Sequence, residues 1–223
     1  MPIPVPDLAA VRFDGAPSST GGTEDVTGRS ITHRGVAIGG ASAVKVGLDA
    51  HWTPYIACAD VDAAAARAAA AGGVVTTGQP AAVPGIGRIA PILDPEKSIF
   101  VALAPQVDRA APHSAPGRFE WERHRTADVA GAAEFYAATF GWEVTLGEGG
   151  AVVDADGLRV AELAPDESAS GWLPFVRVED LTEARRRIVA LGGAADEPIL
   201  WRGSAGYALV RDPQGVAFAV HAG

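Results

Sequence analysis

Glutamate, histidine and arginine gather in one short segment of the chain, residues 118–125. Glu122 and His124 are candidates for general acid or base, because carboxylates and imidazoles are common proton-transfer groups in enzymes. Arg123 and Arg125 are candidates for binding a carboxylate or a developing oxyanion, since a guanidinium makes forked hydrogen bonds and keeps its charge. These four residues form the candidate catalytic set.

The same segment has the pattern of a β-strand, in which successive side chains point to opposite faces of a sheet. Trp121, Arg123 and Arg125 then share one face, and Glu122 and His124 share the other. Which face lines a ligand site depends on the register of this strand. A bulge or a one-residue slip would exchange the two sets.

His221 offers one further donor near the C-terminus. With a slipped register, Glu122 and His124 would join it in a His/carboxylate metal site. The alternative is a cluster of ion pairs with no metal. We predict the second arrangement, and therefore no metal ligands and no cofactor.

Aromatic residues are concentrated in the second half of the chain, where Trp121, Trp201 and Tyr207 are candidates for ligand contact. Trp201 and Tyr207 lie in or beside segment 200–206, which we predict to be a loop between two strands. A pocket lined by Trp and Tyr suits flat or apolar molecules. His221 completes the predicted ligand-binding set.

These residues lie within a sequence that repeats itself. Trp52-Thr53-Pro54-Tyr55-Ile56 is matched by Trp172-Leu173-Pro174-Phe175-Val176, and both runs continue to an Asp, a helical stretch, Gly-Gly, Asp-Pro and Phe in one order. A period of this length is too long for a solenoid unit. It predicts two small modules of one fold in tandem.

The second module consists of two successive βαβββ units. Asp128 supplies a capping signal for the first helix, and Gly141 ends that helix. The predicted helices are 129–140 and 181–191, and the predicted strands are 118–125, 142–146, 149–155, 158–163, 172–178, 194–199, 206–211 and 216–221. The fold class is therefore α+β, with paired βαβββ units.

The first module shows only its last βαβββ unit clearly. We predict a helix at 61–71 and strands at 53–59, 74–78, 87–93 and 98–104. Arg34-Gly35-Val36 matches the hairpin at Asp156-Gly157-Leu158, but no helix precedes it. The predicted organisation is an irregular segment at 1–32, an abbreviated first module at 33–104, a linker at 105–117 and a second module at 118–223.

Several of these features resemble the vicinal oxygen chelate superfamily, which includes glyoxalase I, bleomycin-resistance proteins and extradiol dioxygenases. They are Phe135-Tyr136, Phe140-Gly141-Trp142, the frame from Asp180 to Gly192-Gly193, and Asp212-Pro213-Gln214-Gly215 before Phe218. The resemblance covers about 33–104 and 118–223. It implies paired βαβββ modules curled around a cavity, but not one chemistry, since one fold hosts many functions.

The resemblance also implies where metal ligands would stand. Members with metal chemistry place one ligand near the start of the first strand, at the position of Trp121 here. A second follows the Phe after the Asp-Pro turn, at the positions of Val101 and Ala219. None of these three side chains can donate a lone pair to a divalent cation. The expected metal site is absent on this alignment.

Composition limits the classes of partner. The net charge is −9, which argues against nucleic acid and against an anionic membrane surface. The single cysteine, Cys58, has no internal disulfide partner, and no stretch of sequence is long and apolar enough to cross a bilayer. We predict a soluble cytoplasmic protein whose partner is a small molecule.

The leading functional prediction is a metal-independent protein, similar to bleomycin-resistance proteins, that binds a small apolar or aromatic molecule in the second module. One alternative is a metal-free cyclase, isomerase or lyase of natural-product metabolism, with acid–base chemistry at Glu122 or His124 and anion binding by Arg123 or Arg125. Another is a metal-dependent glyoxalase or dioxygenase with a displaced site. A third is that the abbreviated first module completes a homodimer through unpaired strand edges. The sequence leaves open whether the protein is an enzyme.

Overall fold

The computed structural model describes residues 29–33, 36–41, 50–106, 115–155, 158–167, 169–201 and 204–222. The first part of the chain holds β1 (Arg29–His33), β2 (Val36–Ala41), β3 (Tyr55–Ala57), α1 (Val61–Ala70), β4 (Val74–Val75), β5 (Ala81–Val83), β6 (Gly87–Leu93) and β7 (Ile99–Pro105). The second module holds β8 (Phe119–Thr126), α2 (Val129–Phe140), β9 (Glu143–Gly147), β10 (Gly150–Ala155), β11 (Leu158–Pro165), β12 (Gly171–Arg177), α3 (Leu181–Ala190), β13 (Ala194–Ala195), β14 (Ile199–Trp201), β15 (Ser204–Arg211) and β16 (Ala217–His221).

Three βαβββ units share one pairing rule, in which the first and last strands of each unit are parallel neighbours. These pairs are β3 with β7, β8 with β11, and β12 with β16. Antiparallel pairing of β8 with β12 joins two units into one nine-stranded sheet, and β3 to β7 form a separate five-stranded sheet. Paired βαβββ units of an α+β fold are thus confirmed for the second module.

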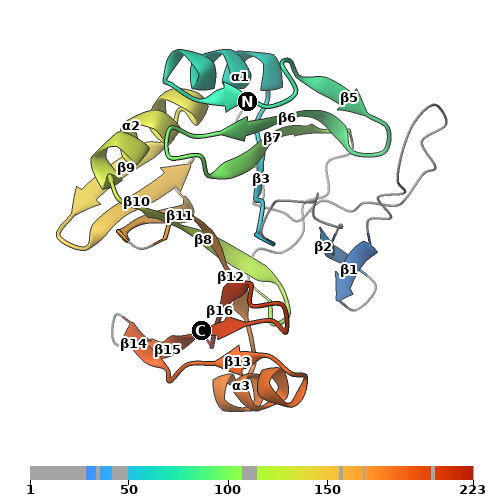
Figure 1. The fold of residues 1–223 in the computed structure, drawn as a ribbon, viewed down its shortest axis with the longest axis vertical. Coiled ribbons are helices and arrows are strands. Elements are labelled where there is room, and N and C mark those ends of the chain that lie inside the picture. The colour runs from blue at the N-terminus through green and yellow to red at the C-terminus, as the bar shows by residue number, and fades with distance from the viewer. Residues whose placement is uncertain are drawn as a thin grey trace.

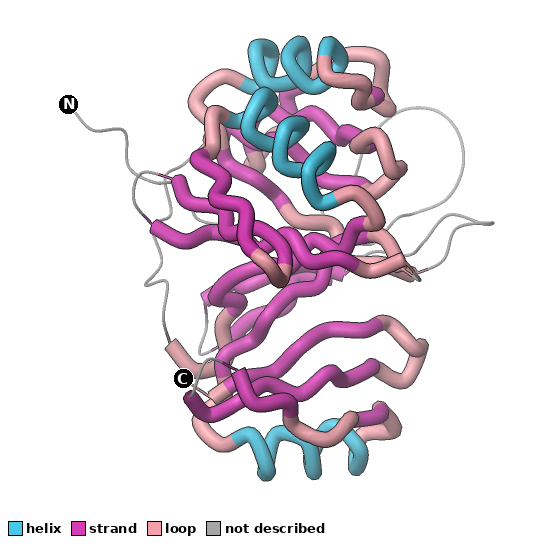
Figure 2. Tube along the Cα trace, turned by 90° about the vertical axis from the view of Figure 1, so that its left-hand side faces the viewer, coloured by secondary structure: helices cyan, strands magenta, loops and turns pink. Residues whose placement is uncertain are grey.

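The helices lie outside the strands. α1 and α2 lie side by side at one end of the molecule and α3 lies at the opposite end, with the strands between them (Figures 1 and 2). We call the sheet face of the second module that carries α2 and α3 the outer face, and the opposite face the inner face. No helix in the described part of the chain is both long and apolar enough to span a membrane.

Local sequence explains why the repeated elements recur. Asp60 caps α1 by accepting a hydrogen bond from the Ala63 amide at 3.0 Å, and Asp180 caps α3 in the same way from Glu183 at 2.9 Å. Each helix ends in a Gly-Gly pair. The first glycine of each pair has a positive φ, which is +93° at Gly72 and +88° at Gly192. A side chain on the second would press against backbone carbonyls.

Most predicted elements are found within a few residues of their expected bounds. The exceptions are β5, which the sequence did not indicate, and the 194–199 stretch, which is divided between β13 and β14. β1 begins at Arg29, ahead of the predicted start of the module at 33. The rest of 1–32, and residues 34 and 35 of the predicted hairpin, lie outside the described residues.

The two modules meet through a shared apolar core between α1, α2 and the sheets. Phe100 of β7 contacts Phe135, Tyr136 and Phe140 of α2, with ring centroids 5.5–6.1 Å apart. α1 turns alanines toward this core, and Ala64 and Ala68 are fully buried. Small side chains let the two helices approach closely. Arg67 of α1 also donates to the Thr139 carbonyl of α2 at 2.9 Å.

A buried carboxylate, Asp94, adds polar contacts to this junction. Its Oδ1 accepts from the Ser98 amide at 2.8 Å within its own turn. Its Oδ2 accepts from the Tyr136 hydroxyl at 2.9 Å and lies 3.0 Å from His124 Nε2. Burial and the Asp94 carboxylate raise the pKa of Tyr136 well above its usual value, which keeps this phenol a donor.

The equivalent turn of the second module provides a matched comparison. Asp212 Oδ1 accepts from the Gln214 and Val216 amides, both at 2.9 Å, so its local role equals that of Asp94. Asp94→Asn keeps the local acceptor but turns an amide donor toward Tyr136 and His124. We expect it to lower the free energy of unfolding by about 1–3 kcal/mol more than Asp212→Asn does. Urea unfolding of both variants measures the difference. Equal losses would contradict a role for Asp94 between the modules.

Candidate functional site

A β-bulge sets the orientation of strand β8. Phe175 pairs with Trp121 and the next residue, Val176, pairs with Phe119, so Glu120 is the extra residue. Beyond the bulge the side chains alternate, and Trp121 lies on the inner face. The bulge therefore turns Glu120 toward the inner face and leaves the rest of the strand in the register that the sequence pattern indicates.

Glu122 and His124 point to the outer face, where the first module covers them. His124 is fully buried against Tyr136 and Trp172, with ring centroids 5.3 and 4.8 Å away. Glu122 is buried, and no described residue pairs with it. Desolvation raises the pKa of its carboxyl from 4.5 to about 8. Neither residue can therefore act on a molecule bound at the inner face.

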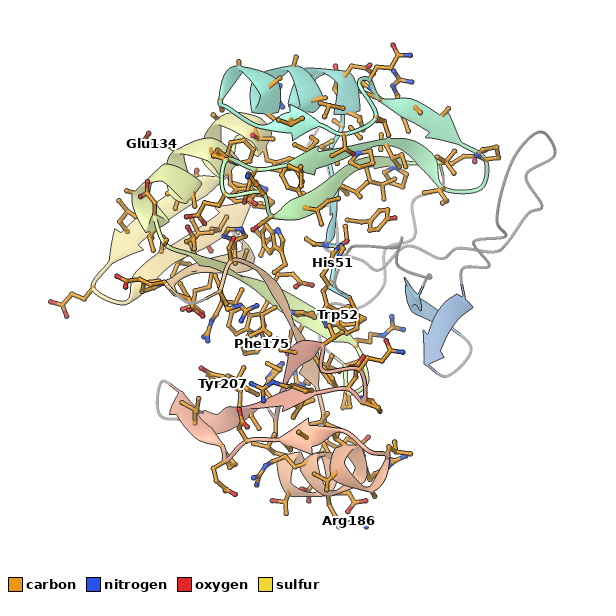
Figure 3. All side chains as sticks on the ribbon, viewed as in Figure 1. His51, Trp52, Glu134, Phe175, Arg186 and Tyr207 are labelled. Atoms are coloured by element: carbon orange, nitrogen blue, oxygen red, sulfur yellow. The ribbon has the colours of Figure 1, made fainter. Side chains whose placement is uncertain are left out.

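The inner face carries an aromatic cluster. Trp121 and Phe175 stack at 3.9 Å between centroids, and Tyr207 packs edge-on against Phe175 at 5.2 Å. Leu173 and Ala219 complete this buried group. Figure 3 shows Phe175 and Tyr207 in the part of the molecule between the α1–α2 layer and α3. The structure thus brings together Trp121 and Tyr207, two of the predicted ligand-binding residues.

Arg123 is held firmly within this cluster. Its guanidinium lies 2.9 Å from Glu162 Oε2 and donates to the Tyr207 hydroxyl at 2.9 Å. It also lies 5.1 Å from the centroids of both Phe175 and Tyr207, a cation–π arrangement. With an ion-pair partner already in place, Arg123 contributes positive charge and rigidity more than a free binding group.

Arg125 is the next residue along the inner face and has a different environment. It makes no hydrogen bond or ion pair with any described residue, and its Nε is buried. Its neighbours on the adjacent strands are Ala164 and Gly171, both small. A Cβ built on Gly171 would meet no atom within 4 Å. Arg125 therefore has an unused donor set beside open space.

A second polar group stands on the inner face at the bulge. Glu120 Oε2 lies 2.8 Å from His221 Nε2, and Glu120 Oε1 accepts from Arg177 Nη1 at 3.3 Å. The His221 ring lies 6.3 Å from that of Phe175. Burial lowers the pKa of His221 below its usual value, although the Glu120 carboxylate opposes this effect.

The sequence missed three members of this face: Glu162, Phe175 and Arg177. The alternation of side chains within the predicted strands 158–163 and 172–178 could have assigned them to this face. It could not have shown which residues they contact there. Tyr207 lies within strand β15, as the predicted strand 206–211 has it. The predicted loop at 200–206 is shorter than expected, because β14 extends to Trp201 and β15 begins at Ser204. Trp201 ends β14, and its side chain lies outside the described residues.

The donors available do not fit a catalytic metal. Trp121 and Ala219 occupy two expected ligand positions on the inner face, and the first-module position is the buried Val101. The alternative site of Glu122, His124 and His221 is not assembled, because His221 lies on the opposite face of the sheet from the other two. Among the described residues, no three His, Cys, Asp or Glu side chains form a group suited to a metal ion.

A groove of about 440 Å³ lies elsewhere, between the 94–96 turn and α2. Three of its four carboxylates are already used in the fold. Asp128 caps α2 through the Gly131 amide, Glu96 accepts from the amides of residues 127 and 128, and Asp94 is the junction carboxylate. Glu134 extends outward from α2 (Figure 3). The groove therefore belongs to the junction between the two modules, and we do not take it as the ligand site.

The strand order and the paired βαβββ units define the vicinal oxygen chelate fold. Residues 123–221 match the family model of the glyoxalase-like domain. The extradiol ring-cleaving dioxygenase of Brevibacterium fuscum has the same fold, with a TM-score of 0.57 at 15% identity over 83% of this chain and 57% of that one. The chain therefore has the fold of the vicinal oxygen chelate superfamily, and residues 123–221 of its second module are similar to the glyoxalase-like domain.

Two curated relatives have similar sequences. CFP32 of Mycobacterium tuberculosis, named as a glyoxylase, is 35% identical over 105 residues, which are 45% of this chain and 40% of CFP32. The anthracycline biosynthesis protein DauV of Streptomyces sp. strain C5 is 31% identical over 184 residues, which are 78% of this chain and 66% of DauV. The chain therefore spans less than two thirds of the length of each relative.

The buried Glu122 makes a pH-dependent contribution to stability. Its pKa is higher in the folded state, about 8 against 4.5, so folding favours the protonated form. Stability from this group is complete below about pH 4.5 and is lost as the pH rises toward 8. Glu122→Gln keeps the shape and removes the charge. We expect it to match the native protein near pH 5 and to be more stable than it at pH 8, as measured by urea unfolding.

The exposed Glu134 of α2 provides the control for this measurement. Glu134→Gln should leave the pH dependence of unfolding as it is in the native protein. A Glu122→Gln variant with the same loss of stability between pH 5 and pH 8 as the native protein would show that Glu122 is ionised in the folded state.

Proposed function

We propose that the protein binds a flat, largely apolar or aromatic molecule with an anionic oxygen on the inner face of the second module, without a metal ion. The observation that carries the proposal is Arg125, an arginine with no partner among the described residues, on the face that holds the Trp121–Phe175 stack. A guanidinium on the same face as aromatic rings can recognise the anionic part of such a molecule while the rings contact its planar part.

The aromatic part of the proposal rests on the composition of the inner face. Trp121 and Tyr207 each keep 8% of their surface accessible beside the fully buried Phe175, and the Arg123–Glu162 pair holds Tyr207 by its hydroxyl. Such rings lose little conformational freedom when a ligand packs on them, because their own neighbours already fix them. A planar ligand is therefore favoured over a flexible one.

The anionic part rests on the difference between the two arginines. Arg123 has its charge balanced by Glu162 at 2.9 Å, whereas Arg125 lies next to Ala164 and Gly171 and has no carboxylate partner among the described residues. A carboxylate, phenolate or enolate would supply the missing acceptor. This would satisfy the buried Nε as well.

Similarity to known proteins supports the same class of ligand. DauV is named as an anthracycline biosynthesis protein, and anthracyclines are fused-ring molecules with phenolic and carbonyl oxygens. The metal-dependent alternative lacks donors at Trp121, Val101 and Ala219. The homodimer and the cytoplasmic location stay predictions.

Binding of lawsone, a planar hydroxynaphthoquinone that is anionic at neutral pH, tests the proposal by titration calorimetry. Arg125→Gln should weaken binding about 10- to 100-fold, since a hydrogen bond to a charged group contributes about 1.5–3 kcal/mol. Arg186→Gln, on the exposed outer surface of α3 (Figure 3), is the control and should bind as the native protein does.

Metal analysis and chelation complete the test. Treatment with a chelator should leave lawsone affinity unchanged. Stoichiometric zinc, iron or manganese in the purified protein, with binding lost on chelation, would overturn the metal-independent part. Native affinity in Arg125→Gln would overturn the assignment of the anion site.

A further inference from the structure

The aromatic rings of the proposed ligand site have almost no accessible surface. Trp121, Phe175 and Tyr207 are all buried, and the Arg123 and Glu162 side chains beside them keep 14% of their surface accessible. A flat molecule cannot pack against these rings until one of the covering groups moves. The structure therefore shows the inner face in a closed form.

Tyr207 reaches this cluster from a distant strand of the same sheet. It belongs to β15, and strands β16 and β12 lie between β15 and β8. In a flat sheet, strand spacings of about 4.8 Å would put β15 and β8 roughly 14 Å apart. The Tyr207 hydroxyl nevertheless accepts a hydrogen bond from Arg123 Nη1 at 2.9 Å. The sheet is therefore curled, and this hydrogen bond joins its two arms across the inner face.

The Arg123 end of this contact is fixed in place. Its guanidinium is also paired with Glu162 at 2.9 Å. Strand β8 itself is held by the first module, because His124 Nε2 lies 3.0 Å from Asp94 Oδ2. Arg123 therefore keeps its position when the hydrogen bond to Tyr207 breaks.

The Tyr207 end belongs to the arm with less cover. Helix α3 packs on β13, β15 and β16 of its own unit, and none of its residues is buried. Leu191, at the end of α3, keeps 75% of its surface accessible. Tyr207 lies on the α3 side of Phe175 (Figure 3). Because segments with few buried contacts open at a low free energy, Tyr207 is the partner that moves.

We propose that Tyr207 is a gate over the inner face and that Arg123 is its catch. The gate opens when the Tyr207 hydroxyl leaves Arg123 and β15 moves away from β8 together with α3. A ligand then reaches the Trp121 ring and Arg125. Binding follows opening, so the ligand selects an open form that is a minor part of the free protein. This inference rests on the proposed ligand site and concerns the control of access to it.

Amide hydrogen exchange tests the gate without any ligand. Tyr207→Phe keeps the ring against Phe175 and removes the acceptor of the hydrogen bond. We expect exchange in residues 206–210 of β15 to become about 10- to 100-fold faster, because a hydrogen bond to a charged group stabilises the closed form by about this factor. Exchange in β8 should stay at the native rate. Tyr55→Phe makes the same chemical change in the first module and should leave both strands unchanged.

Stopped-flow binding of lawsone tests the link between the gate and the ligand site, with quenching of tryptophan fluorescence as the signal. Because opening comes before binding, the observed rate should reach a plateau as the lawsone concentration rises. Tyr207→Phe should raise this plateau by about 10-fold, since the hydrogen bond no longer opposes opening. Tyr55→Phe should keep the native plateau.

Each outcome decides one part of the proposal. Native exchange in β15 of Tyr207→Phe, or equally faster exchange in β15 and β8, rejects the gate, because the second result is a general loss of stability. An observed rate that never levels off and is equal in the native protein and Tyr207→Phe rejects control of entry by Tyr207 and leaves the ligand site standing. Failure of lawsone to bind rejects the ligand site, and exchange in β15 then decides the gate alone.

Discussion

The contact between Asp94 and His124 is the constraint on which the rest of the structure depends. His124 lies on β8, the strand that pairs with both β11 and β12 and so joins the two arms of the second module. With its imidazole 3.0 Å from a buried carboxylate of the other module, β8 cannot slip by one residue without exposing or burying the wrong side chains. The register that this contact fixes is the one that turns Trp121, Arg123 and Arg125 to the inner face.

Strand β8 therefore separates two kinds of polar chemistry by face. On the outer face Glu122 and His124 are buried between modules, where they affect stability and its pH dependence. On the inner face Arg123 stands among aromatic rings, and Arg125, which has no ion-pair partner among the described residues, carries the charge proposed to bind a ligand. The bulge at Glu120 is the exception, since it moves a single carboxylate from one set to the other and supplies His221 with a partner.

The repeat, the helix caps and the Asp-Pro turns could be predicted from the sequence because each depends on local contacts. The alternation of β8 was also readable, including which residues share a face. The bulge at Glu120 was not, since it depends on how Phe175 and Val176 pair with the neighbouring strand. The second role of Asp94 and the Arg123–Glu162 pair depend on residues far apart in the chain, which single-sequence patterns do not connect.

The two repeated helices, α1 and α3, differ in how much of their surface is buried, and this affects how the site can open. α1 is rich in buried alanine because α2 packs on it, whereas α3 carries Arg185, Arg186 and Arg187 and has no buried residue. Segments with few buried contacts open at lower free energy than the rest of a domain. The arm from β13 to β16, which brings Tyr207 and His221, is therefore the softer wall of the site, and β8 is the rigid one.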